Sequence, residues 1–312
     1  MTKFLTGWLD HPPQNVWVTI GNFDGVHLGH RALIRGLRER AEMHRGQSLV
    51  LTFAPHPRVA LGFVSEAFLL TAQNEKQRQL QDTGVNMVLT LPFDRDLAEM
   101  RAEAFMERLY QSLKPAGLLV GPQFRLGRNR EGDFSFIQDF CADRGIICET
   151  FPPFQLGGEV VSSHRIRALL KEGRVIEAAE LLGRPFSLEG EVRHGKHIGS
   201  KLGFPTANLI PEPLQLLPRY GVYATRVRLM DRVFMGVTNV GVRPTFESDA
   251  APNVETLILD FGDKIYSETM RVEFLSFLRP EQRFEQVGEL VAQIKKDETE
   301  TRRIFQIGRA HV

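Results

Sequence analysis

Short apolar runs alternate with helical patterns from residue 16 to about residue 183 of this 312-residue chain. Between the first two runs, Leu33, Ile34 and Leu37 recur at helical spacing. Near-continuous apolar strands with helices between them predict a parallel α/β sheet, in which ligands bind beyond the carboxyl ends of the strands. The predicted strands are Val16–Ile20, Ser48–Phe53, Met87–Leu91, Gly117–Gly121 and Ile146–Thr150.

The pattern changes after Gly183, where short strands follow one another without long helices between them. The chain then ends in one amphipathic helix, with Val287, Leu290, Val291 and Ile294 on its apolar face. This half predicts a small antiparallel barrel, so we expect two domains, 1–183 and 184–312. Its predicted strands are Phe186–Val192, Tyr223–Leu229, Val233–Val240, Val254–Phe261 and Met270–Phe277.

Composition excludes several classes of protein. With 42% hydrophobic and 25% charged residues the chain is ordinary for a globular protein, and a net charge of +1 gives no reason to expect nucleic acid or an acidic membrane as partner. Cys141 and Cys148 match neither a CxxC motif nor a secreted disulfide framework. Asp10 and two prolines interrupt the apolar start, which is a poor signal peptide. We therefore expect a cytoplasmic protein.

The first candidate site is the segment Gly21–His30, GNFDGVHLGH, which leads from a predicted strand into a predicted helix. His27 and His30 lie three residues apart, so both imidazoles face the same side of the first helical turn. Unpaired backbone N–H groups and the positive end of the helix dipole make that turn a phosphate site. The simpler alternative is a tight turn that carries two surface histidines.

A second candidate site follows residue 190. Gly190–His197, GEVRHGKH, nearly matches a P-loop, but it has His where Ser or Thr binds Mg²⁺ and no helix follows it. Gly195 and Gly199 border a loop that could wrap phosphates with backbone N–H groups. If the next segment is extended, Thr206 and Asn208 face the same side and offer oxygen ligands to Mg²⁺. The alternative is a turn followed by a polar strand edge.

Glu255 gives an independent indication in this half of the chain. Strand alternation places it on the same face as Leu257, Leu259 and Phe261. A carboxylate on an apolar face is unusual and is a candidate general base. The alternative is a glutamate at a strand end that reaches solvent.

Taken together, these motifs resemble the nucleotidyltransferase superfamily with a His-x-Gly-His motif and, more specifically, the bacterial bifunctional riboflavin kinase/FAD synthetase family. The resemblance covers nearly the whole chain, and both signatures come in the expected order. The further matching segments are Thr52–Pro57, Leu91–Asp94, Gly121–Gly127, Ser162–Arg167, Gly203–Asn208, Gly221–Tyr223, Asn239–Phe246, Val272–Phe274 and Phe277–Arg279.

This resemblance implies a Rossmann-like nucleotidyltransferase domain with a parallel sheet, followed by a small antiparallel six-stranded β-barrel with a terminal helix. It implies two reactions: ATP phosphorylates riboflavin to FMN, and ATP then adenylylates FMN to give FAD and pyrophosphate. The implied partners are ATP, riboflavin and FMN, with Mg²⁺ bound together with ATP.

The resemblance also assigns roles to residues of both sites. In the first, His27, His30 and Arg167 would stabilise charge, and the nucleotide or flavin would contact Gly21, Asn22, Phe23, Asp24, Gly25, Gly29, Ser162, Ser163 and Arg165. In the second, Thr206 and Asn208 would bind Mg²⁺ and ATP, and Glu255 would deprotonate the ribityl hydroxyl. The remaining contacts of the second site would be Gly195, Lys196, Gly199, Asn239 and Arg279.

Five positions depart from the usual family pattern: Gln123, Leu126, His164, Ser200 and Leu257. The first three fall where the family contacts flavin or phosphate, and Leu257 stands beside the proposed base. Two alternatives therefore remain open beside the bifunctional enzyme. One is a chain in which only one of the two modules is active. The other is a non-catalytic flavin-binding or regulatory protein.

Overall fold

The computed structural model describes residues 1–64, 66–193, 203–242, 252–263, 265 and 268–309. The chain forms two compact units: Met1–Glu66 with Gln73–Ser163, and Ala67–Ala72 with His164–Val312. The sequence predicts a boundary between two functional domains at residues 183 and 184, and that boundary stays a prediction. The two compact units meet elsewhere in the chain, between Ser163 and His164.

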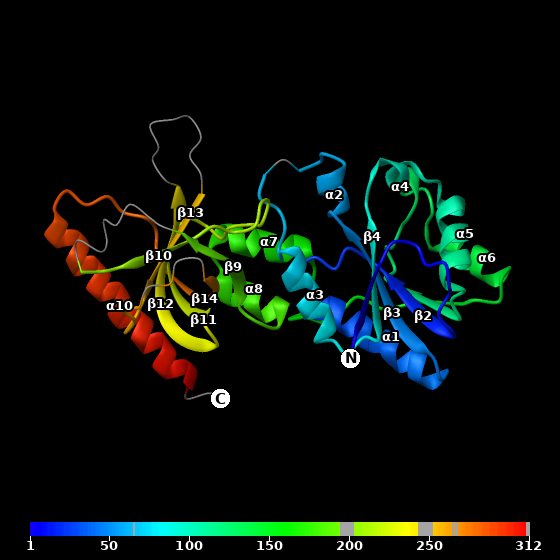
Figure 1. Cartoon of the computed structure of the whole chain (residues 1–312), viewed down its shortest axis with the longest axis horizontal. Coiled ribbons are helices and arrows are strands. Elements are labelled where there is room, and N and C mark those ends of the chain that lie inside the picture. Colours follow the sequence, from blue (N-terminus) through cyan, green and yellow to red (C-terminus); the bar gives the residue numbers. More distant parts are fainter. Residues whose placement is uncertain (65, 194–202, 243–251, 264, 266–267, 310–312) are drawn as a thin grey trace. The chain divides into compact units, whose positions relative to one another are not determined.

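The first unit contains a six-stranded parallel sheet in the order β1-β4-β3-β2-β5-β6. Figure 1 labels its strands β2, β3 and β4. The predicted parallel sheet is confirmed, and each of the five predicted strands begins and ends within one residue of its prediction. The edge strand β1 was missed because its four residues are short and mostly exposed. The bounds are β1 (Lys3–Thr6), β2 (Val16–Ile20), β3 (Gln47–Ala54), β4 (Met87–Pro92), β5 (Gly117–Val120) and β6 (Ile147–Thr150).

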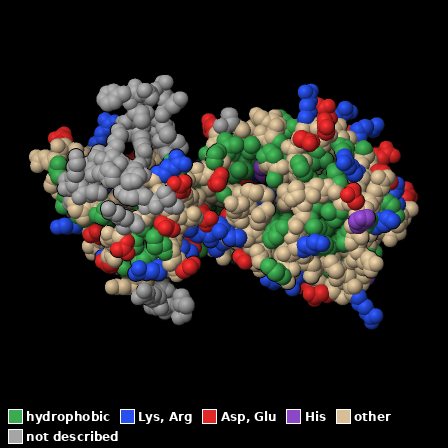
Figure 2. All heavy atoms as spheres, in the orientation of Figure 1, with side chains coloured by type: hydrophobic (Ala, Val, Ile, Leu, Met, Phe, Trp, Pro, Cys, Tyr) green, Lys and Arg blue, Asp and Glu red, His purple; other side chains and the backbone are tan. Residues whose placement is uncertain are grey.

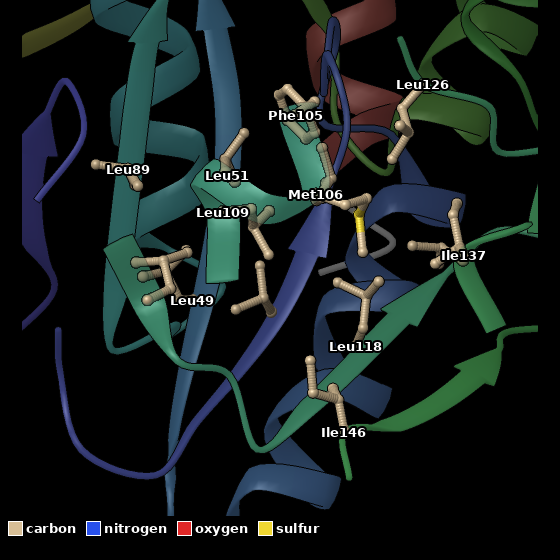
Figure 3. Close-up of a cluster of buried hydrophobic side chains, with 14 of the residues drawn as sticks. Leu49, Leu51, Leu89, Phe105, Met106, Leu109, Leu118, Leu126, Ile137 and Ile146 are labelled. Atoms are coloured by element: carbon tan, nitrogen blue, oxygen red, sulfur yellow. The ribbon is translucent and has the colours of Figure 1, made fainter. Parts of the chain in front are cut away.

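Helices cover both faces of this sheet because its strands bury side chains on both sides. Val18 and its alternate neighbours pack with α5 (Ala102–Leu113) and α6 (Phe134–Ala142). Figure 3 shows part of this cluster, where leucines of the strands gather with side chains of α5. On the other face of the sheet, Trp17 and further strand side chains pack with α1 (Leu28–Met43) and α3 (Gln73–Gln81). The shorter elements are α2 (Pro57–Ala60), α4 (Arg95–Glu99), the 3₁₀ helix η1 (Arg128–Arg130), β7 (Gln155–Leu156) and β8 (Glu159–Val160).

The second unit is built on a closed antiparallel barrel in the order β10-β13-β12-β11-β14-β9. The predicted six-stranded barrel with a terminal helix is confirmed. Its strands are β9 (Phe186–Arg193), β10 (Thr206–Leu209), β11 (Gly221–Leu229), β12 (Arg232–Val242), β13 (Pro252–Ile258) and β14 (Thr269–Arg279). Its helices are α7 (Ser163–Glu172), which begins at the last residue of the first unit, α8 (Val175–Leu182) and α10 (Val287–Arg309).

Alternate side chains of the barrel strands are fully buried, among them Phe274, which contacts the ring of Tyr223 edge-on at 5.1 Å between centroids. Thr225, Thr238 and Thr256 are also fully buried, and their hydroxyls form a chain with O–O distances of 2.8 and 2.9 Å. These buried hydroxyls therefore satisfy one another across three strands.

A buried charged pair and an apolar contact help to attach the terminal helix α10 to the barrel. The guanidinium of Arg279, at the end of β14, donates to both carboxylate oxygens of Asp297 at 2.8 to 3.1 Å. Asp297 is only 5% exposed, so this bidentate pair is largely shielded from water. Ile294 packs beside it against an apolar cluster that includes Val237 and Leu257.

Truncating the barrel core tests this packing. Phe274→Ala should lower the free energy of unfolding of the second unit by about 3–5 kcal/mol, because it removes a fully buried ring and leaves a cavity. Val233→Ala on β12 is the control, since that side chain is exposed and should change the value by less than about 0.5 kcal/mol. Urea denaturation measures both, and equal effects would contradict the assignment of Phe274 to the core.

Candidate functional site

The loop between β2 and α1 has an unusual backbone. Phe23, Gly25 and Val26 have φ values of 50°, 88° and 35°, in the left-handed region. That conformation is a genuine outlier for a β-branched residue such as Val26 and stores strain. The side chains of Phe23 and Val26 are at most 1% exposed. The Val26 N–H donates to the Phe23 carbonyl at 3.2 Å. Burial of these two side chains therefore holds the loop in a conformation it would not adopt alone.

His27 ends this loop and is the N-cap of α1. Its Nδ1 accepts the backbone N–H of His30 at 3.3 Å, which leaves the ring proton on Nε2. The rings of His27 and His30 stack with centroids 3.6 Å apart and an angle of 15°. A Cβ at position 29 would lie 3.1 Å from His27 Cε1, so Gly29 leaves room for the ring. The two predicted imidazoles thus lie side by side at the start of α1.

His30 is neutral in the free protein near pH 7. Burial, the neighbouring His27 and the positive charge of Lys76 all hold the pKa of His30 well below its usual value. Its ring meets Phe23 edge-on at 5.1 Å. Its Nδ1 is buried and has no hydrogen-bond partner within the part of the chain that the structure describes. A buried polar atom of this kind needs a partner, which a ligand can supply.

Lys76 on α3 is a residue of this site that the sequence analysis missed. Its side chain is 6% exposed, and its Nζ donates to Phe53 O at 3.1 Å, to Thr52 Oγ1 at 3.4 Å and to Asn22 O at 3.5 Å. Burial lowers the pKa of Lys76 to about 8, although Asp24 partly offsets the shift. A buried ammonium therefore lies where the loop after β2 meets the end of β3.

Ser163 links the same loop to the start of α7. Its hydroxyl donates to the backbone carbonyl of Asp24 at 2.8 Å, although the two residues lie 139 positions apart in the chain. Asp24 itself is 4% exposed. The structure therefore brings together the Gly21–His30 and Ser162–Arg167 segments at this serine. Of the other predicted contacts, Asn22 is exposed and Ser162 is half-buried.

Arg165 and Arg167 follow on α7 and belong to the second unit. The Arg167 Nε donates to the Phe68 carbonyl at 2.8 Å, and its guanidinium lies 3.7 Å from the centre of the Phe68 ring. These contacts hold the side chain in a defined position. The predicted role of both arginines at the phosphates stays a prediction.

The second predicted site forms a row across three barrel strands. Asn208 on β10 pairs directly with Glu255 on β13, and Glu255 pairs with Asn239 on β12. Directly opposed residues on neighbouring strands have Cβ atoms roughly 4.5–5.5 Å apart. Glu255 is half-buried and Asn208 is 3% exposed. An acid and two amides therefore share one face of the barrel.

Thr206 extends this row by two residues toward the start of β10. It pairs with Leu257, faces the same side as Asn208 and is exposed. Leu257 is 8% exposed and packs with Leu259 in the apolar cluster under α10. The prediction that Glu255 shares its face with leucines is therefore confirmed, although β13 ends at Ile258 rather than at Phe261.

Two further predicted contacts of the second site already have protein partners. Asn239 donates through Nδ2 to Glu281 Oε1 at 3.1 Å, and Arg279 is paired with Asp297. Gly195, Lys196 and Gly199 lie outside the described residues, as does Ser200. Their roles stay predictions.

The oxygen donors on the barrel suit Mg²⁺ chemically. Asn208, Thr206 and Glu255 offer amide, hydroxyl and carboxylate oxygens, which are hard ligands. Among the described residues, no group of three or more His, Cys, Asp or Glu side chains could hold a metal ion by itself. A magnesium ion bound here would therefore take much of its coordination from phosphates and water.

Several residues depart from the family pattern, and those that the structure describes do not disturb the core. Leu126 is 7% exposed and packs in the cluster under α5 and α6. Gln123 and His164 are exposed.

Within the described residues, no helix combines the length and the apolar character needed to cross a bilayer. On the face drawn in Figure 2, basic and acidic side chains are interspersed.

Two family models match two separate parts of the chain. Residues 10–165 match the family model described as FAD synthetase, and residues 182–305 match the one described as riboflavin kinase.

Relatives extend this similarity over nearly the full length. The "Bifunctional riboflavin kinase/FMN adenylyltransferase" of Escherichia coli (strain K12) is 38% identical and covers 94% of both chains. The protein with the same description from Listeria monocytogenes is 34% identical over 96% of this chain and 98% of its own. Among solved structures, one titled "Crystal Structure of Macrolide-efflux Protein from Streptococcus pneumoniae" matches with a TM-score of 0.87 and 28% identity, over 96% of this chain and 98% of its own.

Replacing the buried lysine tests its electrostatic cost. Below pH 8 Lys76 is charged in the folded and unfolded states, and the folded state carries the full burial penalty. The penalty disappears between pH 8 and 10.5, where the unfolded state still binds the proton. Lys76→Met should therefore raise the free energy of unfolding at pH 7 by up to roughly 3 kcal/mol, less the lost hydrogen bonds.

Denaturation of wild type and Lys76→Met at several pH values measures this gain. It should shrink steadily as the pH rises from 8 to 10.5. A gain that does not vary with pH would mean that the stabilisation comes from packing rather than from removing a buried charge.

Proposed function

The chain belongs to the bifunctional riboflavin kinase/FMN adenylyltransferase family, and from that premise we propose which residues perform each of its two reactions. The chain is an enzyme that phosphorylates riboflavin to FMN and adenylylates FMN to FAD, with ATP as the second substrate of both. The site residues, Mg²⁺ and a cytoplasmic location are our proposals.

The loop from Gly21 to His27 and the start of α1 form the adenylyl-transfer site in this proposal. The FMN phosphate attacks the α-phosphorus of ATP, a new P–O bond forms, and the bond to the leaving pyrophosphate breaks. No protein nucleophile is needed, because the substrate phosphate attacks directly. The protein contributes position and charge stabilisation.

The imidazoles supply hydrogen bonds to phosphate oxygens. His27 carries its proton on Nε2, because its Nδ1 accepts the His30 N–H. His30 is a neutral ring whose buried Nδ1 has no hydrogen-bond partner among the residues that the structure describes. The first backbone N–H groups of α1 and the helix dipole favour negative charge at the same place. Ser162 and Ser163 add further phosphate contacts by resemblance, and the phosphate roles of Arg165 and Arg167 rest on resemblance alone.

The row Asn208, Glu255 and Asn239 forms the kinase site in this proposal. Glu255 removes the proton from the terminal ribityl hydroxyl of riboflavin. The resulting oxygen attacks the γ-phosphorus of ATP, and ADP leaves with the electron pair of the broken P–O bond. A half-buried carboxylate on the strand face that carries Leu257 suits this role, because its surroundings exclude water from much of its surface.

Thr206 and Asn208 would hold Mg²⁺ together with the phosphates of ATP. The ion would neutralise phosphate charge during transfer. Gly195, Lys196, Gly199 and the end of β14 at Arg279 are assigned to the same site by resemblance alone.

One observation carries the proposal. The stacked His27–His30 pair lies in the first compact unit, and the paired Asn208 and Glu255 lie in the second. Two reactions that need different geometries therefore have two separate sets of side chains.

Replacing one imidazole should separate the two activities. His30→Gln should lower the rate of FAD formation from FMN by about 10²–10³-fold, as for other lost charge-stabilising donors, and should leave the phosphorylation of riboflavin unchanged. Chromatography of the flavins separates FMN from FAD and measures both rates. Equal loss of both activities would contradict separate sites.

Replacing the carboxylate should give the opposite pattern. Glu255→Gln keeps the shape of the side chain but removes the base, so FMN formation from riboflavin should fall by about 10²–10⁴-fold. Added FMN should still be converted to FAD at the wild-type rate. If Glu255→Gln phosphorylates riboflavin normally, another group must accept the hydroxyl proton.

A further inference from the structure

Three parts of the first unit meet at the ammonium of Lys76. The side chain comes from α3, and its Nζ donates to a carbonyl of the loop after β2, at Asn22, and to Thr52 and Phe53 at the end of β3. All three acceptors are neutral oxygens, and two of the distances are 3.4 and 3.5 Å. The ammonium is thus held in place by weak contacts, at the edge of the sheet where ligands bind.

The charged and titratable groups around Lys76 come from the loop after β2, from α1 and from α3 itself. Asp24 in the loop raises the pKa of Lys76, and the positive charge of Lys76 lowers the pKa of His30 on α1. His27 stacks on His30. On α3 itself, the carboxylate of Glu75 pairs with the guanidinium of Arg78 at 3.1 Å.

Glu75 therefore already has a cationic partner of its own. It also accepts from Gln79, whose Oε1 accepts from Arg31 of α1 at 2.7 Å. This network joins α3 to α1 and fixes the helix that carries Lys76.

Lys76 belongs to none of the sequence motifs described above, but its contacts suggest a function for it. We propose that Lys76 is a positioning residue of the adenylyl-transfer site, whose ammonium draws the phosphates of ATP and FMN to the Gly21–His27 loop, and that phosphate binding there is accompanied by proton uptake. This inference rests on the proposed function, since it concerns the same site.

The electrostatic reason is the state of the site without substrate. His30 is a poor source of positive charge, because it is neutral. The start of α1 and the ammonium of Lys76 contribute positive charge at this place. With a pKa of about 8, Lys76 is only partly protonated at pH 8. An incoming phosphate stabilises the charged form, so a proton is taken from the solvent.

A purely structural role is the alternative. Lys76 would then serve only to tie the loop carbonyl at Asn22 to the end of β3. Lys76→Arg distinguishes the two, because arginine keeps the positive charge but stays protonated at pH 8. Lys76→Met removes the charge, and Lys3→Met removes an exposed lysine from β1 of the same unit as a matched control.

The kinetic test uses the full chain with FMN and ATP supplied. For wild type, kcat/KM of FAD formation should decline as the pH rises through about 8, because this ratio reports the free enzyme. Lys76→Met should lower kcat/KM at pH 7 by at least tenfold, mainly through KM. Lys76→Arg should recover much of that loss and should not show the decline near pH 8. Unchanged kcat/KM in Lys76→Met would overturn the proposal.

The second readout is calorimetry of ATP binding at pH 8 in buffers with different enthalpies of ionisation. Wild type and Lys3→Met should take up roughly half a proton more per chain than Lys76→Arg or Lys76→Met. ATP binding by the kinase unit contributes equally to all four proteins and cancels in the difference. Equal proton uptake in all four would overturn the proposal, and so would a failure of Lys76→Arg to recover activity together with a pH profile like that of wild type.

Failure of this inference can be told apart from failure of the proposed function. If wild type converts FMN to FAD and His30→Gln does not, the adenylyl-transfer site stands whatever the Lys76 variants do. If His30→Gln retains full FAD formation, the site itself is wrong and Lys76 loses its assigned role with it.

Discussion

The hydrogen bond from the backbone N–H of His30 to the ring of His27 is the contact on which the first site depends. It caps α1, leaves the His27 proton on Nε2 and holds the two rings in a stack. Serine, threonine, aspartate and asparagine are the usual residues at an N-cap, so a histidine there is unusual. In our proposal His27 both caps the helix and contacts phosphate. The strained loop before it is stable because Phe23 and Val26 are buried. Burial in the core thus compensates for the local strain in the loop that we propose binds phosphate.

In the barrel, strand register rather than a helix terminus positions the side chains of the proposed site. The pairing of β10, β13 and β12 decides that Asn208, Glu255 and Asn239 stand in one row. A slip of one residue would turn Glu255 into the barrel and Thr256 out of it, which would break the chain of buried hydroxyls. The interior of the barrel therefore fixes the position of the acid on its outer side. The stability of the barrel and the proposed kinase chemistry therefore depend on the same strand register.

Much of this arrangement could be predicted from the sequence, because it follows from local pattern. Apolar runs gave the strands, and the spacing of His27 and His30 gave their common face. Alternation placed Glu255 on an apolar face, and the pairing with Asn208 agrees with the predicted site. In each case the neighbours that determine the position are close in the sequence or repeat with a simple period.

The parts that could not be predicted depend on contacts between distant segments. Lys76 lies in the polar run QNEKQRQLQ, which looks like an exposed helix, and its burial results only from packing against the sheet. The strand β1 is too short to show a period. The bond from Ser163 to the Asp24 carbonyl joins residues 139 apart, and no local pattern reports such a contact.

The central claim is that two independent phosphate sites lie on one chain, and mixing two variants tests it most directly. His30→Gln retains the barrel site and Glu255→Gln retains the His27–His30 site. Supplied with riboflavin, ATP and Mg²⁺, neither protein alone should accumulate FAD at more than a small fraction of the wild-type rate. An equimolar mixture should produce FAD, because FMN released by the first protein is a substrate for the second. A mixture that makes no FAD, although each protein retains its own single activity, would contradict the account.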